Sequence, residues 1–174
     1  FKRVMTAVIG LPVLVAILIL GGRVIQFAGM AVLLIALYEF YKSMEHDGYR
    51  PIKNIGYMGT ILLVLFSTHS INIMVVFLTI LATLIHYLFD SNCRVKDLGI
   101  SVLGFIYVPF FLIHIILTAN LELSFLVWYI FIIAWSTDTF AYFVGVFFGK
   151  NKLFEAVSPK KTIEGSIGGI LGCI

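Results

Sequence analysis

Apolar runs close to twenty residues long recur along the chain, and they limit its fold more than any other feature does. A helix of about 20 apolar residues can cross a hydrocarbon core about 30 Å thick. Composition agrees, since 12% of the residues are charged, against roughly 25% in soluble domains. We therefore expect an all-α, polytopic transmembrane helical bundle with six spans, at residues 4–20, 24–41, 55–66, 73–89, 100–118 and 125–148, and a seventh that begins at Ser166.

The basic residues are distributed unevenly between the loops of this predicted bundle. If the N-terminus and every second loop lie on one side of the membrane, that side receives all twelve Lys and Arg except Arg23. Loops rich in Lys and Arg usually stay in the cytoplasm. The pattern therefore predicts a cytoplasmic N-terminus, and it accounts for the net charge of +3 without a nucleic-acid partner.

An aspartate lies near the middle of the sixth predicted span. Asp138 precedes Phe148 by about 15 Å of helix. A charged aspartate at that depth costs about 2.5 to 3.5 kcal/mol, so we expect it to face a polar cavity and to mark a functional site. The alternative is a structural aspartate that is protonated or bonded to neighbouring hydroxyl groups, such as those of Ser136 and Thr139.

The same helix face carries further groups that could form a site. Tyr142, Gly145 and Gly149 follow Asp138 at intervals that place all four on one stripe of a helix. The stripe combines an acid and a phenol with two positions that lack side chains. The spacing G-x-x-x-G is also typical of close helix contacts in membranes, and we favour that role for the two glycines.

The most polar stretch of the chain, SPKKTIEGSIGG, follows this span at residues 158–169. Ser158 and Pro159 predict a helix start, with serine as the N-cap and proline in the first turn. Lys160 and Lys161 would add positive charge beside the free N–H groups of that turn, which favours an anion such as phosphate. The other groups of this candidate site are Thr162, Glu164, Gly165, Ser166, Gly168, Gly169 and Gly172. The alternative is a basic cytoplasmic loop followed by a glycine-rich packing helix.

A longer pattern surrounds this stretch. Residues 136–169 contain an Asp, then Ala-Tyr, Gly and Gly-Lys, followed by Ser-Pro-Lys-Lys-Thr-x-Glu-Gly and Gly-Gly. The pattern and its spacing resemble the bacterial phosphatidate cytidylyltransferases, also called CDP-diacylglycerol synthases. A looser resemblance covers the whole chain. It implies a multi-pass enzyme of the bacterial inner membrane, active on its cytoplasmic face, that forms CDP-diacylglycerol and pyrophosphate from CTP and phosphatidic acid in phospholipid biosynthesis.

The same resemblance implies roles for individual residues. Asp138, Lys160 and Lys161 would be catalytic, and Mg²⁺ would be required, with Asp138 as one candidate ligand. The acids that hold the metal ions in this family belong to a C-terminal signature, Lys-Asp and Asp-Arg-x-x-Asp, which we expect beyond Ile174. The substrate-binding residues would be Tyr142, Ser158, Thr162, Glu164, Gly165, Ser166, Gly168 and Gly169.

The resemblance also suggests how the chain is divided. Residues 1–124 would form N-terminal helices with about five spans, and residues 125–174 would begin the catalytic region. Because the chain begins with Phe1 rather than Met and ends inside an apolar stretch, we expect it to be a segment of a longer protein. We expect this segment alone to be inactive.

Two other functions stay open at this point. A CTP-dependent kinase of polyprenols or other lipids would share the membrane setting and the nucleotide, but it would transfer the terminal phosphoryl group. A membrane transporter would fit Asp138 and the glycine-containing helices, although its polar residues would be spread over several spans. The sequence also leaves open the role of Glu39 near the end of the second span, and the formation of a homodimer.

Overall fold

The computed structural model describes residues 2–67, 69–121, 123, 125–155 and 158–174. Contacts within the chain divide it into two compact units, Phe1–Ser124 and Phe125–Ile174. Apart from one short two-stranded hairpin, the regular structure of the described residues is helical. The prediction of an all-α, helical membrane protein is therefore confirmed.

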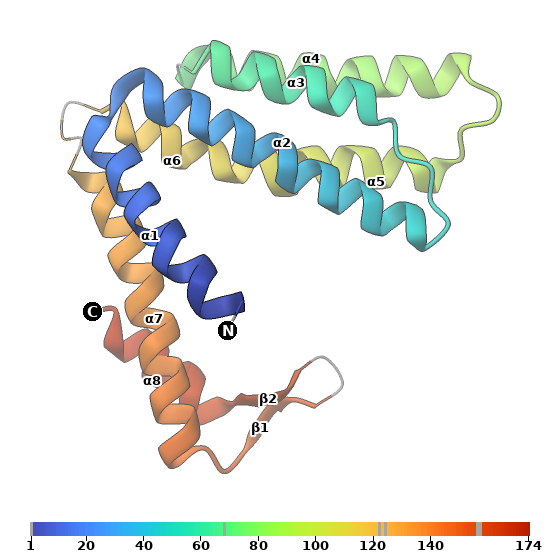
Figure 1. Ribbon diagram of the computed structural model, residues 1–174. Coiled ribbons are helices and arrows are strands. Elements are labelled where there is room, and N and C mark those ends of the chain that lie inside the picture. Colours follow the sequence, from blue (N-terminus) through green and yellow to red (C-terminus); the bar gives the residue numbers. More distant parts are fainter. Residues whose placement is uncertain (1, 68, 122, 124, 156–157) are drawn as a thin grey trace. The chain divides into compact units, whose positions relative to one another are not determined.

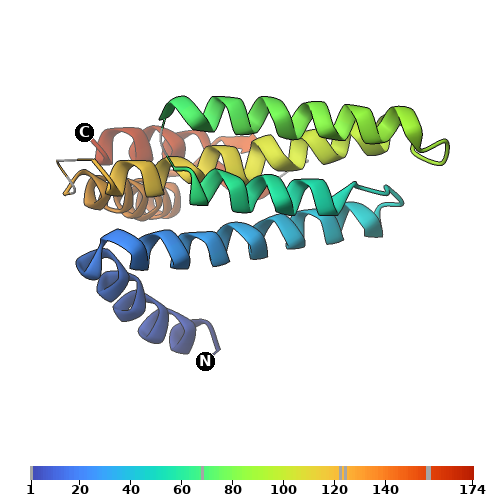
Figure 2. The ribbon, with the colours of Figure 1, turned by 90° about the horizontal axis from the view of Figure 1, so that it is seen from above.

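The first unit is a helical bundle. Its long helical segments lie beside one another (Figure 1, Figure 2), and the first helix contacts the second. The elements in chain order are α1 (Lys2–Leu20), α2 (Gly22–His46), α3 (Lys53–Leu65), α4 (His69–Phe89), α5 (Val95–Phe105), the π-helical segment η1 (Ile106–Phe110) and α6 (Phe111–Ala119).

Four helices among the described residues are long and apolar enough to cross a membrane. α3 has 13 residues, which is about 20 Å of helix and shorter than a hydrocarbon core of about 30 Å. The apolar stretch Val8–Leu20 of α1 is short as well. The number of six spans therefore stays a prediction. The four candidate spans are Gly22–His46, Asn72–Phe89, Val95–Ala119 and Leu126–Phe148.

A proline interrupts the regular hydrogen bonding of the span that the sequence predicts at residues 100–118. Pro109 has no N–H to donate, and its ring crowds the preceding helical turn. The backbone forms the π-helical turn η1 at this point, and α-helix resumes at Phe111. α5, η1 and α6 therefore form one continuous helical segment instead of two separate helices.

Aromatic and aliphatic side chains fill the interior of the first unit. Tyr41 of α2 packs against Val108 of η1. Leu63 of α3, Val75 of α4 and Phe105 of α5 form a second cluster. The two clusters bring side chains from α2, α3, α4 and the α5–α6 segment together, so the bundle has a hydrophobic interior of its own.

A buried carboxylate joins two basic loops of this bundle. Asp97 of α5 is fully buried, and its two oxygens each accept a 2.9 Å hydrogen bond from the guanidinium group of Arg94. Asp97 Oδ1 also accepts a 2.7 Å bond from the backbone N–H of Arg50, while Arg94 Nη2 donates to the carbonyl oxygen of Gly48 at 2.9 Å. The loop after α2 and the loop after α4 therefore lie at the same end of the bundle, as two loops on one side of a membrane must.

The second unit is a helical hairpin with two short strands between its helices. It consists of α7 (Leu126–Phe148), β1 (Lys152–Phe154), β2 (Ser158–Thr162) and α8 (Ile163–Gly172). β1 and β2 pair antiparallel, with Lys152 opposite Thr162 and Phe154 opposite Ser158. α8 then runs back along α7, so the polar stretch and the sixth predicted span form one compact unit.

Candidate functional site

Glycines form the contact between α7 and α8. Gly165, Gly168 and Gly169 are buried. A β-carbon at Gly168 would lie 2.5 Å from Val144, and one at Gly169 would lie 3.0 Å from the carbonyl oxygen of Thr137. These three glycines therefore let the two helix backbones approach closely, and their contact with a substrate stays a prediction.

The predicted stripe on α7 divides into a packed part and an exposed part. A β-carbon at Gly145 would lie 3.2 Å from Oγ1 of Thr162 and 3.6 Å from Cα of Gly165, which is the close approach that the G-x-x-x-G spacing predicts. Tyr142 is 67% exposed within this unit, and Asp138 is exposed too. The acid and the phenol thus lie beside the helix contact and not inside it.

The helix after the basic stretch begins later than the sequence predicts. α8 begins at Ile163, and its N-cap is Thr162, whose Oγ1 accepts a 3.1 Å hydrogen bond from the N–H of Gly165. The prediction of a helix start at Ser158 and Pro159 is therefore wrong. Both residues belong to β2, because pairing with β1 gives the backbone of this segment hydrogen-bond partners outside a helix.

Lys160 and Lys161 consequently lie on an exposed strand and not at a helix N-terminus. The pairing is irregular at the lysines, because two steps along β1 correspond to four along β2 between Ser158 and Thr162. Such a bulge interrupts the regular alternation of side chains along a strand. Thr162 is buried beside Gly145 of α7 and Gly149, the residue that follows α7. The positive charge of this stretch therefore comes from the lysine side chains alone.

Glu164 ties the end of α7 to the start of α8. Its carboxylate accepts 3.2 Å hydrogen bonds from the backbone N–H groups of Lys150 and Asn151, and a 2.8 Å bond from the side-chain amide of Asn151. The N–H of Ile163 donates in turn to the carbonyl oxygen of Asn151 at 3.0 Å. Glu164 thus positions the chain itself. Its partner Asn151 is a residue that sequence reasoning missed, since no local pattern indicates a contact between these two positions.

The carboxyl pKa of Glu164 lies below its ordinary value. The N–H of its own backbone has the largest effect, and the N–H groups of Lys150 and Asn151 act in the same direction. Each of these hydrogen bonds favours the charged form of the carboxyl group. The charged form is therefore the one that holds the two helices together.

This pKa shift predicts how the link responds to acid. A depressed carboxyl pKa stabilises the folded state above the unfolded pKa, and this contribution is lost as the pH falls through the folded pKa. We expect the link to hold at neutral pH and to loosen below the ordinary pKa of glutamate. Glu164→Gln should mimic this loosening at pH 7, with several-fold faster amide hydrogen exchange at Lys150 and Asn151. The control is Glu155→Gln, in the exposed hairpin turn. Equal protection in the two variants would contradict the proposed link.

Asp138 lies far from the lysines along the axis of α7. It precedes Gly149 by about three helical turns, or roughly 16 Å, and Gly149 is at the level of Thr162. One phosphate group does not bridge that distance. Within this unit the structure therefore brings Lys160 and Lys161 together with Thr162, and it leaves Asp138 deeper along the helix.

The described residues do not supply a complete magnesium site. Among them, no three His, Cys, Asp or Glu side chains lie close enough together to hold a metal ion. Mg²⁺ usually takes one or two carboxylates and completes its octahedral shell with water and substrate phosphates. Asp138 offers a single carboxylate, while that of Glu164 is engaged by Lys150 and Asn151. A magnesium requirement therefore stays a prediction.

The other predicted residues occupy different positions. Ser166 Oγ donates a 3.1 Å hydrogen bond to the carbonyl oxygen of Thr162, so it supports the first turn of α8. Ser158 is partly buried at the start of β2. Gly172 packs against the ring of Phe140, near the end of the helix contact. Glu39 is exposed on α2, and its role stays open.

Proteins named phosphatidate cytidylyltransferase are similar to this chain. The protein of Staphylococcus aureus strain COL is 32% identical over 175 residues, and that of Bacillus subtilis strain 168 is 29% identical over 183 residues. The alignments cover 97% and 98% of this chain but 66% and 67% of the relatives. The chain thus spans about two thirds of the length of the curated relatives that it matches.

The protein of that name from Aquifex aeolicus strain VF5 is 45% identical over 65 residues, which are 37% of this chain and 25% of the relative. No solved structure matches the chain at a significant level. The family model described as the cytidylyltransferase family matches residues 1–174. The chain belongs to the cytidylyltransferase family.

Proposed function

We propose that this chain is part of a phosphatidate cytidylyltransferase, which forms CDP-diacylglycerol and pyrophosphate from CTP and phosphatidic acid. The observation that carries the proposal is the exposed lysine pair, Lys160 and Lys161, on a strand that leads directly into the packed α7–α8 hairpin. Relatives that bear this name align with nearly the whole chain. Both substrates carry phosphate groups, and an exposed pair of cations suits them.

The reaction would transfer a cytidylyl group between two anions. An oxygen of the phosphatidate phosphate attacks the α-phosphorus of CTP, and a new P–O bond forms there. The bond from that phosphorus to the oxygen that bridges to the β-phosphate breaks, and its electron pair leaves with pyrophosphate. Because the reaction joins two phosphate-bearing substrates, we assign the two exposed lysines to two different phosphate groups. Positive charge held close to these oxygens stabilises the charge of the transition state.

The reaction would take place at the cytoplasmic surface of the bacterial inner membrane. Phosphatidate presents its phosphate at a membrane surface, and CTP comes from the cytosol. The positions of the basic residues support six spans, the start of a seventh and a cytoplasmic N-terminus. The shared end of the loops after α2 and α4 is consistent with this topology.

The catalytic region would begin with residues 125–174 and continue beyond Ile174. The resemblance to the family leads us to expect the acids that hold Mg²⁺ in that later part, where the bound metal would neutralise phosphate charge. We therefore expect the 174-residue chain by itself to form no CDP-diacylglycerol.

Product analysis tests the proposed reaction. Full-length protein in membranes is supplied with phosphatidic acid and CTP, and the released phosphates and the lipid products are identified. We expect pyrophosphate and CDP-diacylglycerol in equal amounts. Release of CDP with phosphorylation of a lipid would show a kinase instead. No consumption of CTP, together with movement of a solute across the membrane, would favour a transporter.

A further inference from the structure

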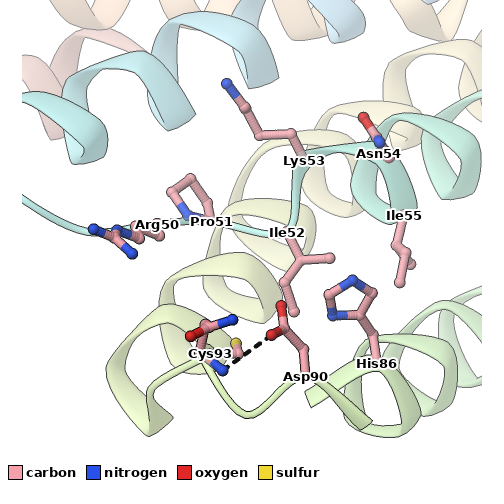
Figure 3. A pocket seen from close by; sticks show the side chains of 10 residues that line it. Arg50, Pro51, Ile52, Lys53, Asn54, Ile55, His86, Asp90 and Cys93 are labelled. Carbon is pink, nitrogen blue, oxygen red and sulfur yellow. Dashed lines mark hydrogen bonds between the residues drawn. The ribbon is translucent and has the colours of Figure 1, made fainter.

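A polar cavity lies in the first unit, where the loop after α2 meets the loop after α4. Its volume is about 420 Å³. The walls come from the α2–α3 loop, the first turn of α3, the end of α4 and the turn that follows α4 (Figure 3). The cavity belongs to the bundle of the first unit and is separate from the lysine strand of the second. Its lining includes Arg50, Lys53, Asn54, His86, Asp90 and Cys93.

The cavity carries charges of both signs. The ring of His86 and the carboxylate of Asp90 lie next to one another, while Arg50 and Lys53 extend away from them at the rim (Figure 3). Lys53 is paired with Glu45 at 2.9 Å. One oxygen of Asp90 accepts a 3.0 Å hydrogen bond from the backbone N–H of Asn92, and no described residue donates to the other oxygen. The cavity therefore offers both cations and an acceptor for a positively charged group.

An apolar groove of about 390 Å³ lies beside this cavity, along α3 and α4. The two share the lining residues Asn54 and Ile55, at the start of α3. Gly59 lets α3 and α4 approach closely at the groove, because a β-carbon there would lie 2.5 Å from Oγ1 of Thr79 on α4. Apolar side chains line the walls, and several of them are exposed, among them Met58, Leu62 and Leu78.

A polar cavity with an apolar groove beside it matches the form of a phospholipid. Its headgroup would occupy the end of the bundle, and one acyl chain would lie against Met58 and Leu78. A nucleotide has no apolar chain that could occupy the groove. A purely anionic headgroup would place a phosphate close to Asp90, and like charges at short range repel one another. A headgroup with a phosphate and an amine fits the charges of both signs.

We propose that this cavity and groove bind one phospholipid with an amine-bearing headgroup. Asn54, which lines both the cavity and the groove, and His86 of the cavity would hydrogen-bond to the lipid phosphate, with Arg50 adding positive charge. Asp90 would accept a hydrogen bond from the ammonium group. The bound lipid would fill the groove between α3 and α4, so it would act on the first unit.

Lipid binding to the purified full-length protein tests this proposal by native mass spectrometry. The probes are phosphatidylethanolamine, phosphatidylglycerol, phosphatidylcholine and phosphatidic acid with identical acyl chains. We expect phosphatidylethanolamine to be retained about tenfold better than the others, the ratio that one charge-assisted hydrogen bond of about 1.4 kcal/mol would give. Equal retention of all four lipids would overturn the proposal. Preferred retention of phosphatidic acid would also overturn it and would instead indicate a substrate site.

Three variants, each with a matched control, locate the site. Asp90→Asn keeps the acceptor for Asn92 but should remove the preference for the amine, whereas Asp47→Asn in the exposed loop should not. His86→Leu should weaken retention of every phospholipid, and the control is His46→Leu at the exposed end of α2.

The third variant tests the groove. Met58→Trp should fill it and lower retention, while Ile73→Trp, on an exposed part of α4, should have no effect. Thermal unfolding of each variant shows whether the bundle is intact. Unchanged lipid retention in all three folded cavity and groove variants would contradict the site.

Discussion

Reversing the charge of both lysines on β2 is expected to lower the activity of the full-length protein by about a hundredfold or more. The variant is Lys160→Glu with Lys161→Glu. Hydrogen bonds to charged groups contribute about 1.5 to 3 kcal/mol each, and two of them together correspond to at least about two powers of ten. Because both side chains are exposed on a strand, the change should leave the α7–α8 packing intact. The rate of CDP-diacylglycerol formation and membrane insertion are both measured.

A matched control separates a role in phosphate binding from a role in topology. Lys42→Glu with Lys96→Glu makes the same change in charge on exposed side chains of the first unit, on the predicted cytoplasmic side. It should have little effect on the reaction. If both double variants lose activity equally, or if neither does, the lysines of β2 have no special part in catalysis.

The single lysine variants are expected to differ from one another. Both side chains are exposed on β2, and each would serve a different phosphate group. The Michaelis constant for CTP should rise in one variant, and that for phosphatidic acid should rise in the other. Identical effects on both constants would contradict the assignment of one lysine to each substrate.

The second large effect is expected from a single methyl group in the helix contact. Gly168→Ala would place a β-carbon 2.5 Å from Val144, and the backbones of α7 and α8 would have to separate. Overpacking of this kind costs about 1 to 3 kcal/mol. We expect a lower midpoint of thermal unfolding and a marked loss of activity, because the strand with the lysines is joined directly to α8.

Gly99→Ala is the control for this change. Gly99 also lies inside a helix, but a β-carbon there would meet no atom within 4 Å. Replacing glycine by alanine in a helix interior is favourable by about 0.8 to 1 kcal/mol when there is space for it. The two alanine variants should therefore shift the unfolding midpoint in opposite directions. A Gly168→Ala protein as stable as the Gly99→Ala protein would contradict the close packing of α7 and α8.

The helical class of the fold could be predicted from the sequence because it depends on local composition. Apolar runs and the positions of Lys and Arg need no knowledge of contacts between distant residues. The number of spans was harder to predict. α3, at Lys53–Leu65, agrees with the short run predicted at residues 55–66, but its 13 residues are about 20 Å of helix, which is shorter than a hydrocarbon core. Likewise, Pro109 produces a π-helical turn inside one continuous helix, which apolar composition alone does not indicate.

The candidate site was predicted in its residues but not in its geometry. Ser158 and Pro159 carry a strong local signal for a helix start, yet pairing with β1 makes them part of a strand. The helix does not start at Ser158 and Pro159 because the strand pairing satisfies the same backbone groups. Thr162 caps the helix in place of Ser158. The lysines consequently lie on an exposed, irregularly paired strand and not in the first turn of a helix.

Contacts between distant residues determined the rest. The sequence alone indicates a helical membrane protein with a lysine- and glycine-rich segment after its sixth apolar run, since these properties depend on local composition. Only the tertiary structure showed that Glu164 binds Asn151, that Asp97 joins two loops, and that the glycines of α8 face α7. Such contacts depend on which side chains the folded backbone brings within a few ångströms, and spacing along a single sequence does not encode that distance.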